Sequence, residues 1–119
     1  NIDSTAGNYW FAGLQQYYSS SGGNNPLSDT SLIALVLDAG ASTGEGISGE
    51  IKMYGLRDAS TWSQATSFLT SHYYGNSYEL YAEGAIHEVA QDDKAVSFSM
   101  NPSGNWAAGT ITVYGVRNA

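Results

Sequence analysis

Two peptides of this chain, sixty residues apart, have nearly the same sequence. Residues 49–59 read GEIKMYGLRDA and residues 109–119 read GTITVYGVRNA, with six of the eleven positions identical. In both, apolar and polar side chains alternate, which is the period of a β-strand with one buried face. Each then reaches Tyr-Gly, where the missing β-carbon permits a bulge or a close backbone approach. We expect two strands that leave a sheet in the same way, with Ile51 and Ile111 buried.

This echo has two interpretations. Two strands built under the same packing rules would resemble each other without any further meaning. A duplicated half-domain or a shared partner-binding edge is the alternative. No catalytic motif lies next to either copy. We therefore interpret the echo as the same structural element used twice, a strand that ends at the edge of the sandwich.

Strand signals recur along the rest of the chain. Residues 9–18 are aromatic, residues 31–37 are almost wholly apolar, and residues 78–89 alternate well enough for one bent strand or two. Residues 96–100 give the cleanest amphipathic pattern, with Val, Phe and Met separated by serines. Turns rich in Gly, Ser and Asn separate these runs at intervals of roughly ten to twelve residues, which is typical of a sandwich or jelly roll.

Two stretches are harder to interpret. Residues 60–72 have apolar side chains at helical spacing, but three threonines weaken a helix, and we favour an irregular strand. Residues 19–29 contain a Ser-Gly-Asn-Pro cluster and are expected to be a flexible loop.

Length and composition define the class of fold. A chain of 119 residues with 42% apolar and 13% aromatic residues suits one folded domain. Charged residues are also only 13%, and Gly, Ser, Thr, Asn and Tyr supply the polarity instead. We predict an all-β fold, an antiparallel β-sandwich of jelly-roll type with about six to eight strands. The domain spans residues 1–119 and is either the C-terminal part of a longer chain or completed by a neighbouring subunit.

The net charge of the chain limits the classes of partner that it can bind. Four Lys and Arg against eleven Asp and Glu give a net charge of −7, which disfavours nucleic acid and anionic membrane surfaces because both require clustered cations. The chain has no cysteine, so disulfides and thiolate zinc sites are excluded. No apolar run reaches the roughly eighteen residues of a membrane span.

Candidate catalytic groups are few. Glu79 and Glu83 share strand parity, but residues four apart on a strand lie about 13 Å from each other, too far for either glycosidase geometry. They are interpreted as part of a solvated strand face. His72 and His87 accompany many serines without a nucleophile elbow, and Asp92 begins an ordinary polar turn. We expect no enzyme, no catalytic residue, no cofactor and no metal.

Aromatic residues offer the best candidates for binding, because their rings stack on sugars and their polar tips suit interfaces. Trp10 and Trp106 follow similar Gly-Asn turns, and we favour core packing for both. Two tyrosine pairs are adjacent in the sequence, Tyr17-Tyr18 and Tyr73-Tyr74. Adjacent residues of a strand point to opposite faces, so one ring of each pair should face outward. The predicted contacts to a glycan or a partner protein are Tyr17, Tyr18, Tyr73, Tyr74 and Trp62.

Three segments carry a resemblance to a known family. They are residues 3–9 (DSTAGNY), residues 103–116 (SGNWAAGTITVYGV) and the strand, turn and Ser/Thr-rich stretch of residues 51–69. Taken together they resemble a family of bacteriophage virion β-sandwich domains of tail fibres and other virion-surface proteins. That family usually carries one or two strands before its N-x-D-x-G turn, whereas this sequence starts almost on the turn. Unseen sequence or a neighbouring subunit would then supply those strands.

The resemblance implies a non-enzymatic structural protein at the virion surface, in a tail fibre or a capsid decoration. Its partners would be other virion proteins, further copies of itself (a trimer by analogy with fibres) and a host-surface glycan. The alternative is a carbohydrate-binding module of a secreted polysaccharide hydrolase. A third interpretation, a small glycosidase, would depend on Glu79 and Glu83.

Overall fold

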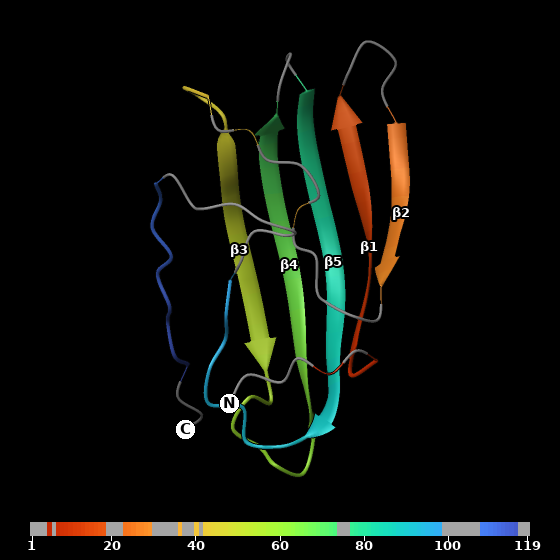
Figure 1. Cartoon of the computed structure of the whole chain (residues 1–119), viewed down its shortest axis with the longest axis vertical. Coiled ribbons are helices and arrows are strands. Elements are labelled where there is room, and N and C mark those ends of the chain that lie inside the picture. Colours follow the sequence, from red (N-terminus) through yellow and green to blue (C-terminus); the bar gives the residue numbers. More distant parts are fainter. Residues whose placement is uncertain are drawn as a thin grey trace.

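The strands that the structure describes form one antiparallel β-sheet (Figure 1). A computed structural model describes residues 5, 7–18, 23–29, 36, 40, 42–73, 77–98 and 108–116, with the backbone alone at 23–29, 73 and 77. Within these residues every regular element is a strand and none is a helix. The all-β, antiparallel part of the prediction is therefore confirmed.

Five strands make up the sheet: β1 (Tyr9–Tyr18), β2 (Gly23–Asp29), β3 (Gly46–Tyr54), β4 (Trp62–Tyr73) and β5 (Ser77–Ala90). Their order across the sheet is β2-β1-β5-β4-β3, and every neighbouring pair is antiparallel. The longest strand, β5, thus lies at the centre and pairs with β1 on one side and β4 on the other.

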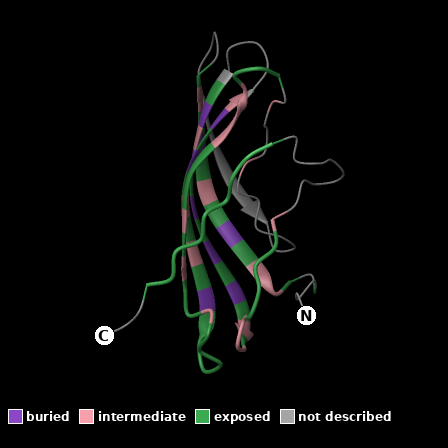
Figure 2. Ribbon diagram, turned by 90° about the vertical axis from the view of Figure 1, so that its left-hand side faces the viewer, coloured by how far each residue is buried: buried purple, intermediate pink, exposed green. Residues whose placement is uncertain are grey.

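Buried residues alternate with more exposed ones along the central strands (Figure 2), so the two faces of this sheet differ in burial. On β5 the odd-numbered residues from Glu79 to His87 are all buried, while the even-numbered ones are exposed or half-buried. Directly paired residues point to the same face, and the register pairs odd with odd throughout β1, β3, β4 and β5. We call the face of the odd-numbered residues of these four strands the covered face, and that of the even-numbered residues the bare face.

The ambiguous stretch of residues 60–72 is a strand, as expected. It forms β4, whose pairing with β5 shifts once, between Trp62 and Ser63. The helical spacing of its apolar residues arose by chance, because Phe68 and Leu69 point to opposite faces of the sheet. Residues 78–89 belong to one strand, β5.

The expected loop at residues 19–29 is wrong for its second half. Gly23–Asp29 pairs along its length with β1 and forms the edge strand β2. Pro26 is compatible with this position, because a proline on an edge strand can leave its nitrogen on the side that needs no partner.

Three other strand predictions had different outcomes. Residues 91–98 include the cleanest alternating pattern, yet they form no strand, and Val96 is 46% exposed. Met100 and residues 31–37, apart from a half-buried Val36 outside any strand, lie outside the described residues. The described residues show five strands in one sheet, not the six to eight of a sandwich.

The two copies of the echo fold differently, so the prediction of one device used twice is wrong. Ile51 lies in β3 and is half-buried, and Gly55 ends that strand with a left-handed φ of 74°. Ile111 lies in no strand and is 60% exposed, and Gly115 has no such φ. A strand needs a neighbour for its backbone groups, and the second copy has none among the described strands.

Candidate functional site

The covered face carries a chain of buried polar side chains. Gln15 of β1 donates from Nε2 to the Tyr81 hydroxyl at 3.1 Å, and Tyr81 in turn donates to Glu79 Oε2. Ser71 of β4 donates to the same carboxylate oxygen at 3.2 Å. All four residues are less than 10% exposed, and Tyr81 is fully buried. Buried polar groups of this kind fix the register of three strands, because each has a specific partner.

Glu83 lies at the middle of the covered face with one oxygen unpaired. Its Oε2 accepts a bond from Ser67 Oγ at 3.4 Å, while Oε1 is buried without a partner. Its side chain occupies the space left by the missing β-carbon of Gly13, its register partner. Burial raises the pKa of Glu83 to about 7, and the Ser67 bond opposes this only in part.

A second polar cluster ties the segment after β5 to the sheet. Asp93 accepts bonds from Ser63 of β4, from Gln91 Nε2 at 2.8 Å and from His87 Nδ1 at 3.2 Å. Its backbone nitrogen also donates to Leu56 O at 2.6 Å. Burial acts to raise the pKa of Asp93, but these side-chain bonds outweigh it and lower the pKa below its usual value.

The same cluster places Ser, His and Asp side chains together without the geometry of a catalytic triad. In a triad the histidine lies between the serine and the aspartate and removes the proton from the serine. Here Ser63 and His87 both bond Asp93 Oδ2, so the aspartate lies between them and the serine donates to a carboxylate. This arrangement orients Asp93 and does not activate Ser63.

Glu79 and Glu83 also lack the arrangement that sugar hydrolysis requires. They share the covered face of β5, as their parity predicted, and lie about 13 Å apart along the strand. The expectation of a solvated face is wrong, because both are buried, at 8% and 7% exposure. No group of three or more His, Cys, Asp or Glu side chains suited to a metal ion occurs within the described ranges.

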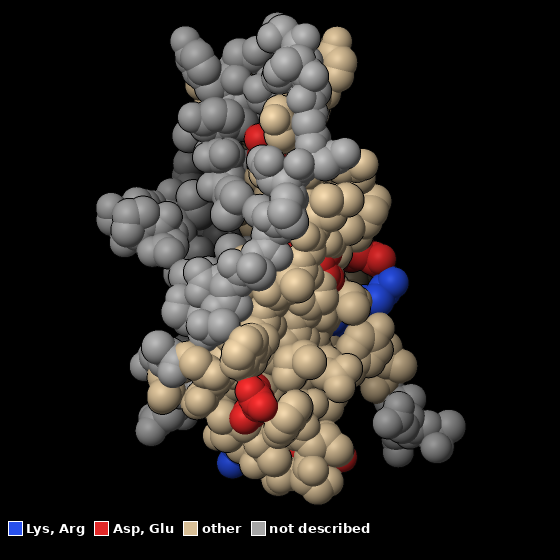
Figure 3. All heavy atoms as spheres, turned by 90° about the vertical axis from the view of Figure 1, so that its right-hand side faces the viewer, with Lys and Arg blue, Asp and Glu red and all other residues tan. Residues whose placement is uncertain are grey.

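The bare face exposes several large apolar side chains. Leu14, Ala82 and Phe68 lie in one row across β1, β5 and β4, and Trp10 pairs with Ile86 at the next apolar row. Of these, Leu14, Phe68 and Trp10 are between 42% and 54% exposed. In Figure 3 the described surface is mainly uncharged, with acidic and basic groups at isolated spots.

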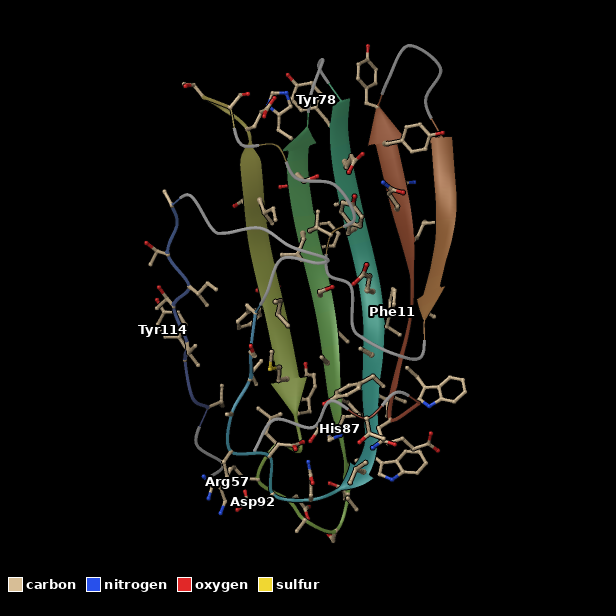
Figure 4. All side chains as sticks on the ribbon, viewed as in Figure 1. Phe11, Arg57, Tyr78, His87, Asp92 and Tyr114 are labelled. Atoms are coloured by element: carbon tan, nitrogen blue, oxygen red, sulfur yellow. The ribbon has the colours of Figure 1, made fainter. Side chains whose placement is uncertain are left out.

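One end of the bare face is aromatic and polar. Tyr18 pairs with Tyr78 and Tyr78 with His72, so three rings lie side by side on adjacent strands. His72 stacks on Tyr78, with ring centroids 4.6 Å apart and an interplanar angle of 4°. The His72 Nδ1 lies 3.0 Å from Gly44 O, and because a carbonyl only accepts, Nδ1 is the donor of this bond. Figure 4 shows Tyr78 at this end of the sheet and His87 at the other.

An open hollow of about 810 Å³ lies over this aromatic end. Its bare-face lining combines the rings of Tyr18, Tyr78 and His72 with polar side chains, among them Gln16 and Thr70. The hollow also reaches covered-face residues such as Tyr17, and its lining includes the carboxylates of Glu45 and Glu79 but no lysine or arginine. Such a surface suits an uncharged, hydroxylated ligand better than an anion.

The residues predicted for glycan or partner contact do not form one site. Tyr18 lies in the aromatic end of the bare face and is 69% exposed, whereas Tyr17 is half-buried on the covered face. Trp62 is 47% exposed on the bare face but pairs with Ala90, about 40 Å along β5 from Tyr78. Tyr73 lies in β4, with its side chain outside the described set, and Tyr74 is not described.

Sequence reasoning missed Tyr78, His72 and Gln16 as candidates for binding. Tyr78 and His72 become neighbours of Tyr18 only through strand pairing, whereas Gln16 shares its face two residues earlier in β1; no local motif marks any of the three. Tyr78 and His72 are even-numbered like Tyr18, which places all three on one face, but this can be inferred only once the strand register is known. Trp10, expected in the core, is half exposed on the bare face.

Comparisons with protein-family models, curated proteins and solved structures found no match for this chain. Among the described residues there is also no helix long and apolar enough to cross a membrane.

Proposed function

We propose that this chain is a non-enzymatic structural module of a bacteriophage virion, in a tail fibre or a capsid-surface decoration, that assembles through its bare face. One observation carries the assembly: the sheet buries ionisable side chains on its covered face and leaves large apolar side chains exposed on its bare face. Glu79, Glu83 and His87 are buried, whereas Leu14 and Phe68 face solvent. A sheet normally buries its apolar face and hydrates the polar one.

Physical chemistry indicates what would cover the bare face. Contiguous exposed apolar patches on soluble proteins mark interaction sites, because removing them from water lowers the free energy. On this face Glu50 and Lys52 form an ion pair at 2.9 Å, which leaves Glu88, near one end of β5, as the unbalanced charge. Copies of a strongly acidic chain would therefore meet over a face that carries little of the net charge. A second sheet packed about 10 Å away would complete the predicted sandwich, supplied by a neighbouring subunit.

The oligomeric state tests this proposal. Native mass spectrometry of the purified chain is expected to find a homo-oligomer, with a trimer favoured by analogy with fibres. Phe68→Lys should shift it to monomer, because it places a charge in the buried interface. Ser97→Lys adds the same charge at an exposed position outside the sheet and should leave the oligomer intact. A monomeric wild-type chain would contradict assembly through the bare face.

The virion assignment is supported by the sequence resemblance in residues 3–9, 51–69 and 103–116. It implies a location on the outside of a virus particle. An antibody against the folded chain should therefore bind intact particles from the source of the sequence. Detection of the chain only in a cellular enzyme complex would contradict it.

The aromatic end of the bare face favours a second candidate, a carbohydrate-binding module of a secreted hydrolase. Tyr18, Tyr78 and His72 offer adjacent ring faces, and the same site would serve host-glycan recognition by a virion protein. Titration with neutral oligosaccharides should then give binding that Tyr78→Ala abolishes and Tyr54→Ala, an exposed tyrosine at the other end of the face, preserves. A monomer that binds sugar favours the module over the virion protein.

A further inference from the structure

Residues 109–116 (GTITVYGV), which we call the echo segment, have the sequence of a strand but lie in no sheet. The segment alternates β-branched residues with polar ones and contains no proline and no charge. Val113 is 84% exposed and Val116 is 92% exposed. Such a sequence gains from pairing its backbone and covering its apolar side chains, and alone it does neither.

The chain contains its own reference for this segment. Residues 49–55 (GEIKMYG) have almost the same sequence and lie in or directly after β3. The difference between the copies is therefore one of neighbours and not of strand propensity. Where a partner strand is present, as β4 is for β3, this sequence forms a regular ladder.

The sheet also has an edge that suits an added strand. β3 is the last strand of the sheet, and no described strand pairs with its outer side. It is nine residues long and free of proline, so its outer backbone groups form an uninterrupted template. The opposite edge, β2, is shorter and contains Pro26, which cannot donate to a ladder.

We propose that the echo segment of one copy adds as a strand to the outer edge of β3 in a second copy. The inference rests on the proposed function, since it requires that copies assemble, and it names the partner and the contact. In Figure 4 Tyr114 lies beyond β3, and it is 84% exposed. Donation from each copy to the next makes a closed ring or a reciprocal dimer, and the contact is made by main-chain hydrogen bonds.

Engineered cysteines test the contact, because the chain has no native cysteine to interfere. Lys52 is the middle residue of 49–55 and Thr112 the middle residue of 109–115, so they lie opposite each other in a parallel or an antiparallel pairing. Lys52→Cys and Thr112→Cys are introduced into two differently tagged chains, which are co-expressed and mildly oxidised. A disulfide-linked heterodimer is expected, since paired residues have Cα atoms about 5.5 Å apart.

Gln16→Cys paired with Thr112→Cys is the matched control. Gln16 is exposed on the bare face of β1, three strands and about 14 Å away from β3. This pair should not link. Linking of the Lys52 and Thr112 pair no better than the control would overturn the proposal. Closure of the disulfide within one chain, when both cysteines are in the same copy, would also overturn it.

Val113→Pro provides a second readout that separates this inference from the proposed function. Proline removes a ladder donor, so the dissociation constant of the oligomer should rise about tenfold or more. The exposed position means that the fold of each copy should not change. Val113→Thr keeps the β-branched shape and should preserve assembly. An oligomer disrupted by Phe68→Lys but not by Val113→Pro overturns strand addition alone, and a monomeric wild type overturns both proposals.

Discussion

The two faces of the sheet both carry apolar and polar side chains, but they differ in which of these they bury. The covered face buries a glutamine, two glutamates and a histidine beside Phe11 and Leu69, whereas the bare face exposes Leu14, Phe68 and Trp10. Buried ionisable groups need specific partners, and here serines and a tyrosine supply them for Glu79 and for one oxygen of Glu83. The hydrogen bonds of the covered face thus fix the register of the strands, and the bare face leaves apolar surface exposed that a partner can cover.

The largest expected difference in stability between the two faces is at two neighbouring residues of β4. Leu69 is 6% exposed on the covered face, and Phe68 is 54% exposed on the bare face. In the dissociated monomer we expect Leu69→Ala to lower the free energy of unfolding by about 3 kcal/mol, because it leaves a cavity. Phe68→Ala should cost less than about 1 kcal/mol. Urea denaturation of both variants checks this, and equal losses would break the distinction between the faces.

Two glycines in neighbouring rows of the sheet, one on each face, allow a second comparison of the faces. A β-carbon on Gly13 would lie 2.5 Å from Glu83 Cγ and 2.6 Å from Ala82 O, while one on Gly84 would meet nothing within 4 Å. Gly13→Ala should therefore lower the free energy of unfolding by about 2–3 kcal/mol through overpacking. Gly84→Ala should be neutral or stabilise the fold by up to about 1 kcal/mol, since it restricts the unfolded chain.

Thermal melts of the two glycine variants provide the measurement. A drop in melting temperature for Gly13→Ala alone is the expected result. A similar drop for Gly84→Ala would mean that the bare face is closed in the isolated chain.

The buried Glu83 should make stability depend on pH. Its pKa is raised from 4.5 to about 7, so between these values the folded chain holds a proton that the unfolded chain has lost. Stability is then greatest below the lower value, falls as the pH rises through the window, and is flat above it. We expect a loss of about 2 kcal/mol between roughly pH 5 and pH 8.

Glu83→Gln should remove this slope, because the amide does not titrate. Glu88→Gln, on the exposed side of the same strand, is the matched control and should keep it. Chemical denaturation at a series of pH values compares the three proteins. A slope that survives in Glu83→Gln would assign the pH dependence to another group.

The smallest expected effect concerns Asp93, at the margin of the covered face. Asp93→Ala removes the acceptor shared by Ser63, Gln91 and His87, and should cost about 1–2 kcal/mol of unfolding free energy. The pKa of Asp93 is lowered, so its contribution is present above the ordinary carboxylate range and is lost in acid. Denaturation of wild type and variant at neutral and acidic pH should show the difference shrinking as the pH falls.

Strand content was predictable from the sequence because the alternation in β3 and β5 is local. The polarity of the faces was not, because parity alone cannot say which side is covered. Glu79 and Glu83 were placed on one face correctly and then assigned to solvent, as their charge suggests. Their burial depends on hydrogen bonds from Ser67 and Ser71, which are remote in sequence and adjacent only across β4 and β5.

The echo shows the other limit of sequence reasoning. GEIKMYG and GTITVYG have the same local preference, and among the described strands only the first has a neighbour. The aromatic end of the bare face was half predictable for a related reason. Tyr18 was identifiable from composition, whereas Tyr78 and His72 join it through a register that no local pattern encodes.

Hydroxyl-radical footprinting tests most directly whether the bare face is an interface. Oxidation of Trp10, Phe68 and Trp62 is read by mass spectrometry in the concentrated protein and in a dilute sample. These side chains are between 47% and 54% exposed in one copy, so they should be oxidised readily when dilute and several-fold less when assembled. Equal oxidation of all three side chains in both samples would contradict the assignment of the bare face as the assembly surface.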